Sequence, residues 1–135
     1  MNRARAVLLV VSVVLAIIGL ATACSEGSSH GIEATQADNG SILEMDVGQQ
    51  LRITLEANPT TGYQWAVEGD LPMQLEQAGE PEFTAESDAI GAGGSEVWSF
   101  EAISPGEGTL RLKYWRSFEP EVDPIEMFEV SVRAK

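Results

Sequence analysis

The chain has 135 residues, a formal net charge of −13, one cysteine and one histidine. Such an acidic chain repels phosphate groups, so nucleic acids and anionic lipid headgroups are poor partners. One cysteine excludes an internal disulfide framework and a paired-cysteine zinc site.

The N-terminal segment, residues 1–23, has the composition of an export signal. Arg3 and Arg5 precede a run of small and apolar residues that extends from residue 6 to residue 23. The end of this run and the next residue, Ala21-Thr22-Ala23-Cys24, resemble a bacterial lipoprotein processing box, in which Cys24 becomes the lipidated first residue. An uncleaved anchor helix is the alternative, because the run is long enough to span a membrane. Either way, we expect a domain tethered outside the cytoplasm, in the cell envelope.

Residues 24–40 are expected to form a flexible tether beginning with the lipidated Cys24, because Ser25 to Gly31 are all small or polar. The only histidine, His30, lies in this tether, which leaves no Ser–His or Cys–His pair for nucleophilic catalysis. An enzyme is therefore the weakest hypothesis, since the carboxylates have no histidine, thiol or metal cluster to organise them. Residues 41–135 suffice for one domain and leave no room for a second.

The rest of the chain consists of short extended runs separated by Gly and Pro turns, with no sustained helical periodicity. The predicted strands are residues 42–47, 51–57, 63–67, 73–77, 97–103, 109–115 and 127–133. Their alternation predicts a single all-β domain, an antiparallel β-sandwich with one face of each strand inside. The residues expected to point inward are Leu51, Ile53, Leu55, Trp65, Trp98, Phe100, Ala102, Leu110, Leu112, Tyr114, Phe128, Val130 and Val132.

A first candidate binding loop, Asn58-Pro59-Thr60-Thr61-Gly62-Tyr63, separates two of these strands. Pro59 fixes its own φ and pushes Asn58 toward extended geometry, while Gly62 permits a positive φ or the close approach of another surface. A loop this constrained loses little entropy when a partner docks on it.

A second candidate is Gly91-Ala92-Gly93-Gly94, just before the strand that contains Trp98. A loop this poor in side chains lets backbone N–H and C=O groups meet a partner directly. The alternative is a mobile hairpin connection with no binding role.

A third candidate follows the strand that ends at Tyr114. Trp115 should face outward, and Arg116 and Phe118 should project from a turn, a composition common in interaction hot spots. Alternatively, Phe118 folds back onto the sandwich and Arg116 merely pairs with Glu119 or Glu121. The nearby acidic residues leave calcium as a minor possibility.

Together, the three loops resemble the chagasin family of cysteine-protease inhibitors. That family carries an Asn-Pro-Thr-Thr-Gly-aromatic loop, a Gly-x-Gly-Gly loop before a Trp-x-Phe-x-Ala strand, and an Arg-Pro-Trp/Phe loop after a Leu-x-Leu-x-Tyr strand. The counterparts here are Asn58 to Tyr63, Gly91 to Gly94 before Trp98-Ser99-Phe100-Glu101-Ala102, and Arg116-Ser117-Phe118 after Leu110-Arg111-Leu112-Lys113-Tyr114. The resemblance spans about residues 41–133. Ser117 stands where the family has proline, so we expect a looser third loop.

The resemblance implies an immunoglobulin-like sandwich whose three loops enter the active-site cleft of a papain-like protease. Thr60 and Thr61 would lie nearest the catalytic cysteine, the glycine-rich loop would run beside the cleft, and Arg116 and Phe118 would cover the opposite wall. The protease-binding residues that it implies are Asn58, Pro59, Thr60, Thr61, Gly62, Tyr63, Gly91, Ala92, Gly93, Gly94, Trp115, Arg116 and Phe118.

A second hypothesis involves no protease: an extracytoplasmic adhesion or ligand-binding module that uses the same loop end, with Trp115 and Phe118 as stacking residues. On either hypothesis we expect a monomer with no cofactor. Inhibition would need no chemistry from this chain, because a stiff wedge excludes substrate without offering the thiolate a carbonyl in attack geometry.

Overall fold

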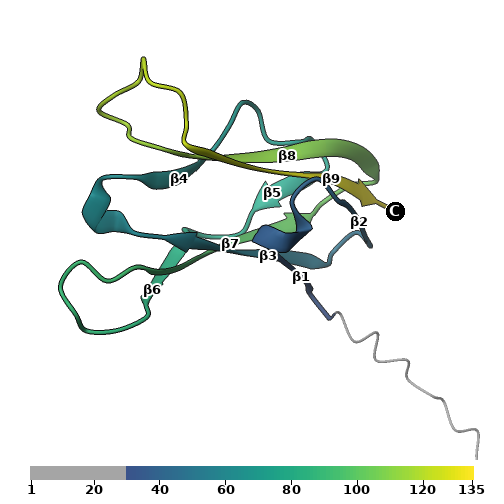
Figure 1. Ribbon diagram of the computed structural model, residues 1–135. Coiled ribbons are helices and arrows are strands. Elements are labelled where there is room, and N and C mark those ends of the chain that lie inside the picture. The colour runs from purple at the N-terminus through teal and green to yellow at the C-terminus, as the bar shows by residue number, and fades with distance from the viewer. Residues whose placement is uncertain (1–29) are drawn as a thin grey trace, which may run out of the picture.

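Two β-sheets packed face to face form the domain (Figure 1). The computed structural model describes residues 30–135. The first sheet contains β1 (Ile32–Thr35), β3 (Gln50–Ala57) and β7 (Gly94–Ala102), with both β5 (Leu75–Gln77) and β6 (Glu82–Ala85) paired to β7. The second contains β2 (Ile42–Met45), β9 (Glu126–Ala134), β8 (Gly106–Trp115) and β4 (Gln64–Val67), in that order. Two short 3₁₀ helices, η1 (Gln36–Asp38) and η2 (Pro59–Thr61), complete the elements. The predicted sandwich is confirmed.

The sandwich is not wholly antiparallel, because its first two strands pair in parallel. β1 lies beside β3 with Ile32 opposite Leu51, and β2 lies beside β9 with Ile42 opposite Ser131. Parallel neighbours need a crossover between them. Here β2, in the other sheet, lies between β1 and β3 along the chain and supplies that crossover.

The fold begins earlier than the sequence indicates, so the expected tether of residues 24–40 is wrong for its second half. β1 and η1 occupy part of it, and Ala34 is buried in the core. Thr35 and Asp38 form a capping box that fixes η1. The pattern missed β1 because it buries only one small side chain. The expected signal peptide, residues 1–23, and Cys24 lie outside the described residues.

One hydrophobic core joins the sheets, and all the residues expected to point inward are buried in it. Ala34, Met45, Ala57, Leu75 and Ala134 add to this core. Within residues 30–135 the buried core residues all lie between 34 and 134, so a chain that starts at residue 25 contains this core. Near one end of the core, the Tyr114 ring stacks on Trp65, with centroids 5.0 Å apart.

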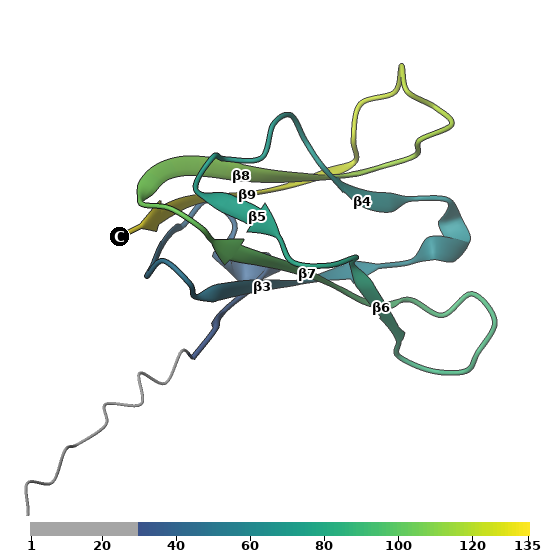
Figure 2. The same cartoon turned by 180° about the vertical axis from the view of Figure 1, so that it is seen from behind.

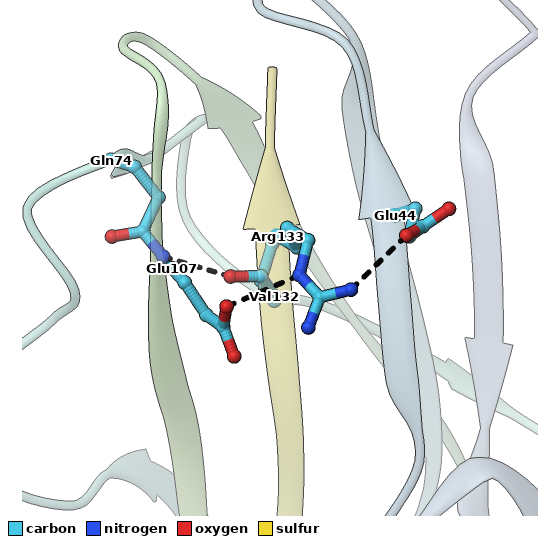
Figure 3. Close-up of polar contacts among 5 residues, drawn as sticks. All are labelled: Glu44, Gln74, Glu107, Val132 and Arg133. Atoms are coloured by element: carbon cyan, nitrogen blue, oxygen red, sulfur yellow. Dashed lines mark hydrogen bonds and ion pairs between the residues drawn. The ribbon is translucent and has the colours of Figure 1, made fainter.

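Polar contacts join β9 of the second sheet to its neighbours β8 and β2 and to Gln74 (Figure 3). The buried Gln74 donates from Nε2 to the carbonyl oxygen of Val132 at 3.0 Å. Arg133 on β9 reaches Glu107 on β8 at 3.1 Å and Glu44 on β2 at 3.3 Å. Hydrogen bonding to Glu107 is the main cause that raises the pKa of Arg133. Within residues 30–135 no helix is both long and apolar enough to cross a membrane.

Candidate functional site

The three candidate loops lie at the same end of the sandwich, on the left in Figure 1. The first loop (58–63) joins β3 to β4, the second loop (86–93) joins β6 to β7, and the third loop (116–125) joins β8 to β9. Gly94 is the first residue of β7, and Trp115 is the last residue of β8. The same grouping is visible from behind, on the right of Figure 2. We call this surface the loop end.

The first loop is held in shape by its own side chains. Asn58 caps η2, accepting hydrogen bonds at Oδ1 from the Thr60 backbone N–H at 3.2 Å and the Thr60 hydroxyl at 2.6 Å. The Thr61 hydroxyl donates to the carbonyl oxygen of Asn58 at 2.6 Å. Pro59 occupies the first turn, and Gly62 ends it in the left-handed region with φ of +79°. The loop is therefore a closed turn with exposed threonines rather than an extended segment.

Arg116 joins the third loop to the first. Its Nε donates to the carbonyl oxygen of Thr61 at 3.2 Å, and its guanidinium lies 4.3 Å from the centre of the Tyr63 ring. Phe118 lies against the same loop: a Cβ atom added to Gly62 would stand 3.0 Å from two atoms of its ring. Glycine at this position lets the two loops touch without displacing the ring.

The alternative interpretation of the third loop is half confirmed. Arg116 does pair with Glu119, at 3.2 Å, and the Glu119 backbone N–H closes a turn onto the Arg116 carbonyl at 3.1 Å. Phe118 does lie back against the sandwich end, at Gly62 of the first loop, yet 67% of it remains exposed. An exposed aromatic ring fixed beside a paired arginine is available to a partner.

Asn58 joins the second loop to the first. Its Nδ2 donates to the carbonyl oxygen of Gly91 at 3.2 Å. Gly93 passes close to the end of β3, where an added Cβ would lie 3.4 Å from the Ala57 carbonyl oxygen. At Gly94 an added Cβ would lie 2.1 Å from the Thr84 carbonyl oxygen, so this position excludes any side chain. The predicted glycine-rich loop thus presents backbone beside the first loop.

Trp115 faces outward as predicted but lies apart from the contact between Arg116, Phe118 and the first loop. Its ring packs under the Lys113 ammonium, 4.0 Å from the ring centre, and Lys113 in turn pairs with Glu68 at 2.7 Å. The indole Nε1 is buried with no hydrogen-bond partner among the described residues. Trp115 therefore lies on the outer face of the second sheet, at the margin of the loop end.

The Tyr114 hydroxyl has a role in the site that the sequence does not predict. Tyr114 was predicted as a core residue, and its ring is buried, but its hydroxyl also accepts a hydrogen bond from the Asn58 backbone N–H at 2.8 Å. This bond anchors the first loop to β8. Alternation in the sequence signals burial of the ring and carries no information about the partner of its hydroxyl.

A shallow acidic cavity of about 340 Å³ lies beside Asn58. Its lining includes Glu56, Glu86 and Glu126. No set of three or more His, Cys, Asp or Glu side chains in residues 30–135 is arranged to hold a metal ion. The cavity therefore contributes negative potential beside the first two loops.

Comparisons with known proteins agree with this architecture. Residues 44–132 match the model of the chagasin family of peptidase inhibitors, I42. Chagasin from Trypanosoma cruzi is 34% identical over 113 residues, which cover 78% of this chain and 98% of that protein.

Two solved structures share the fold. The cysteine protease inhibitor EhICP2 from Entamoeba histolytica has a TM-score of 0.69 at 23% identity, covering 77% of this chain and 95% of its own. PbICP-C, solved in complex with falcipain-2, has a TM-score of 0.52 at 20% identity, with 80% and 93% covered. At these identities the structures support the sandwich alone, whereas the family match and the identity to chagasin concern the sequence itself. The chain belongs to the chagasin family, and is a peptidase inhibitor rather than an enzyme.

Proposed function

We propose that the loop end enters the active-site cleft of a papain-like cysteine protease and blocks it reversibly. The observation that carries this proposal is a pair of hydrogen bonds between loops, from Asn58 to Gly91 and from Arg116 to Thr61. They hold the three loops as one unit. Preorganised loops lose little conformational entropy on binding, which favours tight association. PbICP-C, a protein of this fold, has been solved in complex with falcipain-2.

Within this unit each loop has its own place. The exposed Thr60 and Thr61, at the tip, approach the catalytic cysteine. The backbone of the second loop runs along one wall of the cleft, and Arg116 and Phe118 cover the other. Trp115 contacts the rim of the protease cleft, because it lies at the margin of the loop end. Such a surface would bury about 800 Å² on each partner, the usual size for protease–inhibitor complexes.

The first loop should resist cleavage because hydrogen bonds at three of its carbonyl groups hold it as a closed turn. The Asn58 carbonyl accepts from the Thr61 N–H at 3.2 Å, and the Pro59 carbonyl accepts from the Gly62 N–H at 3.1 Å. The Thr61 carbonyl accepts from Arg116 Nε at 3.2 Å. Attack by a thiolate requires a carbonyl held in near-attack geometry. A closed turn with these bonds differs from the extended backbone that a protease holds for attack, so it can occupy the cleft as a block.

The proposal is tested by titrating purified residues 25–135 against papain and related proteases. We expect reversible inhibition that reaches completion near one inhibitor per enzyme, with an intact inhibitor recovered afterwards. Full protease activity in equimolar mixtures across a panel of papain-like enzymes would reject it.

A matched pair of variants locates the surface. Thr60→Lys places a long charged side chain at the tip, and we expect it to weaken inhibition at least about tenfold, as expected for a central contact. Glu76→Lys changes the charge by more, but lies on β5, which pairs with the end of β7 remote from the loops. Equal losses from both variants, with both folded, would count against the loop end.

We also propose that the domain is anchored in the cell envelope through lipidated Cys24. The position of β1 places the start of the domain away from the loop end. Ile32 is paired with Leu51, near the start of β3, whereas the first loop follows the end of β3. Six residues of strand correspond to about 20 Å. A tether that enters there leaves the loop end free. Cys24→Ser should move the protein from the membrane fraction to the soluble fraction, and unchanged membrane retention would reject lipid anchoring.

A further inference from the structure

A groove of about 570 Å³ opens on one side of the sandwich, between β4 of the second sheet and the β5, β6 and β7 strands of the first. In Figure 2 this side faces the viewer, with β4 above and β6 below. The groove is lined by the whole of β4 and by side chains that include Phe83, Glu96 and Trp98. It is separate from the three loops.

The first observation is that β4 is a free edge with unused backbone groups. It is the last strand of its sheet and pairs with β8 on one side alone. Glu68 donates its N–H to the Arg111 carbonyl of β8 at 2.9 Å. Because hydrogen-bonding direction alternates along an antiparallel strand, Ala66 also faces β8, whereas the N–H and C=O groups of Trp65 and Val67 point outward.

The second observation is that this edge lacks the usual protection against pairing. Edge strands are commonly blocked by charged side chains or proline. Among the described strands, the other edges each carry a glutamate: Glu33 on β1, Glu44 on β2, Glu76 on β5 and Glu82 on β6. β4, with the sequence Gln-Trp-Ala-Val, carries neither a charge nor a proline.

The third observation is a carboxylate without a cation. Glu96 lies on the inner face of β7, where its neighbours in alternation, Gly94 and Trp98, are buried. It accepts a hydrogen bond from Trp98 Nε1 at 2.8 Å, and burial raises its pKa. None of the ion pairs in residues 30–135 includes Glu96, and no basic residue lines the groove.

The surroundings of Glu96 suit a long cationic side chain. Phe83, directly opposite Glu96 in the β6–β7 pair, is 42% exposed and lines the same groove as Glu96. Glu80 also lines the groove and adds a second negative charge. Lys and Arg bury an aliphatic stem on apolar surface and direct the charge at a carboxylate or aromatic ring.

We propose that this lateral groove binds an extended segment of a partner protein, which adds to the free edge of β4 and places a Lys or Arg side chain between Glu96 and Phe83. Backbone hydrogen bonds to Trp65 and Val67 supply the pairing, as in other cases of strand addition. The single basic side chain supplies the selectivity, through a charge-assisted hydrogen bond. The groove does not depend on the loop end, so a partner can occupy it while a protease is bound.

The test uses isotope-labelled residues 25–135 and a blocked pentapeptide, Thr-Val-Arg-Val-Thr, as the probe, followed by NMR. We expect saturable shifts of the Trp65 and Val67 amides, the Phe83 amide and the Trp98 indole. A control peptide with Glu in place of Arg should cause no chemical-shift changes at these residues at the same concentrations. Shifts confined to the loop end, equal shifts with both peptides, or none at millimolar peptide would overturn the proposal.

Variants of the protein sharpen this test. Glu96→Gln keeps an acceptor for Trp98 and removes the charge, so we expect the peptide dissociation constant to rise about tenfold. Glu101→Gln, the same change on the outer face of β7, should leave it unchanged. Val67→Pro removes one outward N–H and should also weaken binding, with the fold checked in the same spectra.

Inhibition of papain should be the same for all three variants, which separates failure of this inference from failure of the proposed inhibitory function. Unaltered peptide affinity in Glu96→Gln would rule out the assigned cation site. Self-association of the chain through β4, detected by sedimentation, would assign the edge to a second copy and overturn the proposal.

Discussion

The side-chain amide of Asn58 spans two loops: its oxygen caps η2 through the Thr60 N–H at 3.2 Å, and its nitrogen donates to the Gly91 carbonyl at 3.2 Å. One residue therefore both shapes the first loop and fixes the position of the second. Neither aspartate nor alanine can do both.

This dual role predicts that Asn58→Asp weakens inhibition while preserving the first loop. Aspartate keeps the acceptor for Thr60 but loses the donor, and it turns an oxygen toward the Gly91 carbonyl. We expect the inhibition constant to rise roughly tenfold, with stability lowered by about 1 kcal/mol. Inhibition kinetics and urea unfolding measure the two effects.

Asn39→Asp provides the matched control. Asn39 also accepts a backbone hydrogen bond, from Glu129 at 2.8 Å, and donates one, to Met127 at 3.4 Å, outside the three loops. The same atomic change there should affect stability without affecting inhibition. If both variants inhibit as the parent does, the tie between the loops has no role in binding.

Gly62→Ala tests the contact between the first and third loops. The substitution places a Cβ 3.0 Å from the Phe118 ring and forces alanine to a φ of +79°. We expect a loss of about 1–2 kcal/mol in stability from the strained backbone, and a displaced Phe118 that weakens inhibition. Unfolding experiments measure the loss of stability, and inhibition kinetics measure the weaker binding.

Gly69→Ala separates strain from contact. Gly69 has a similar φ of +73°, but nothing lies within 4 Å of its added Cβ. It should lose comparable stability and retain full inhibition. A parallel loss of inhibition in the two variants would mean that general destabilisation, and not the loop contact, is responsible.

The sequence predicted the core and the loops because both are encoded locally. Alternating large apolar residues such as Phe100 and Leu112 identify inward faces without any knowledge of topology. β6 was missed because it has only four residues and all four side chains are exposed, so it marks no buried face. The ties between loops were also missed: Asn58 and Gly91 are 33 positions apart, and Arg116 and Thr61 are 55 apart. Side-chain bonds to distant carbonyls leave no periodic signal in a single sequence.

Ser117→Pro should strengthen the inhibitor. Ser117 follows Arg116 in the turn closed by the Glu119 N–H and the Arg116 carbonyl, which is the position where proline is favoured. Proline there restricts the unfolded chain and stiffens the third loop, for a gain of about 0.4–1 kcal/mol in stability. We expect slower dissociation from papain, measured by surface plasmon resonance. Faster dissociation in a folded variant would show that the third loop needs its present freedom.

The final prediction concerns the dependence of stability on pH. Burial is the main cause that raises the pKa of Glu96 above its ordinary value of 4.5, and the hydrogen bond from Trp98 partly opposes this effect. The folded state therefore binds the carboxyl proton of Glu96 more tightly than the unfolded state does. Stability attributable to Glu96 is present below the unfolded pKa and is lost as pH rises through the higher folded pKa.

Glu96→Gln should accordingly be more stable than the parent at pH 7, since glutamine has no charge to desolvate and still accepts from Trp98. The gain should stay below about 1 kcal/mol, because Glu96 is only half-buried and solvent screens its charge. Urea unfolding from pH 3 to pH 7 should show the two proteins converging as the pH falls below the ordinary carboxyl value. Glu101→Gln on the same strand should follow the parent throughout. A Glu96→Gln variant less stable than the parent at pH 7 would mean that the charged carboxylate stabilises the fold, and that its environment is more polar than the groove geometry indicates.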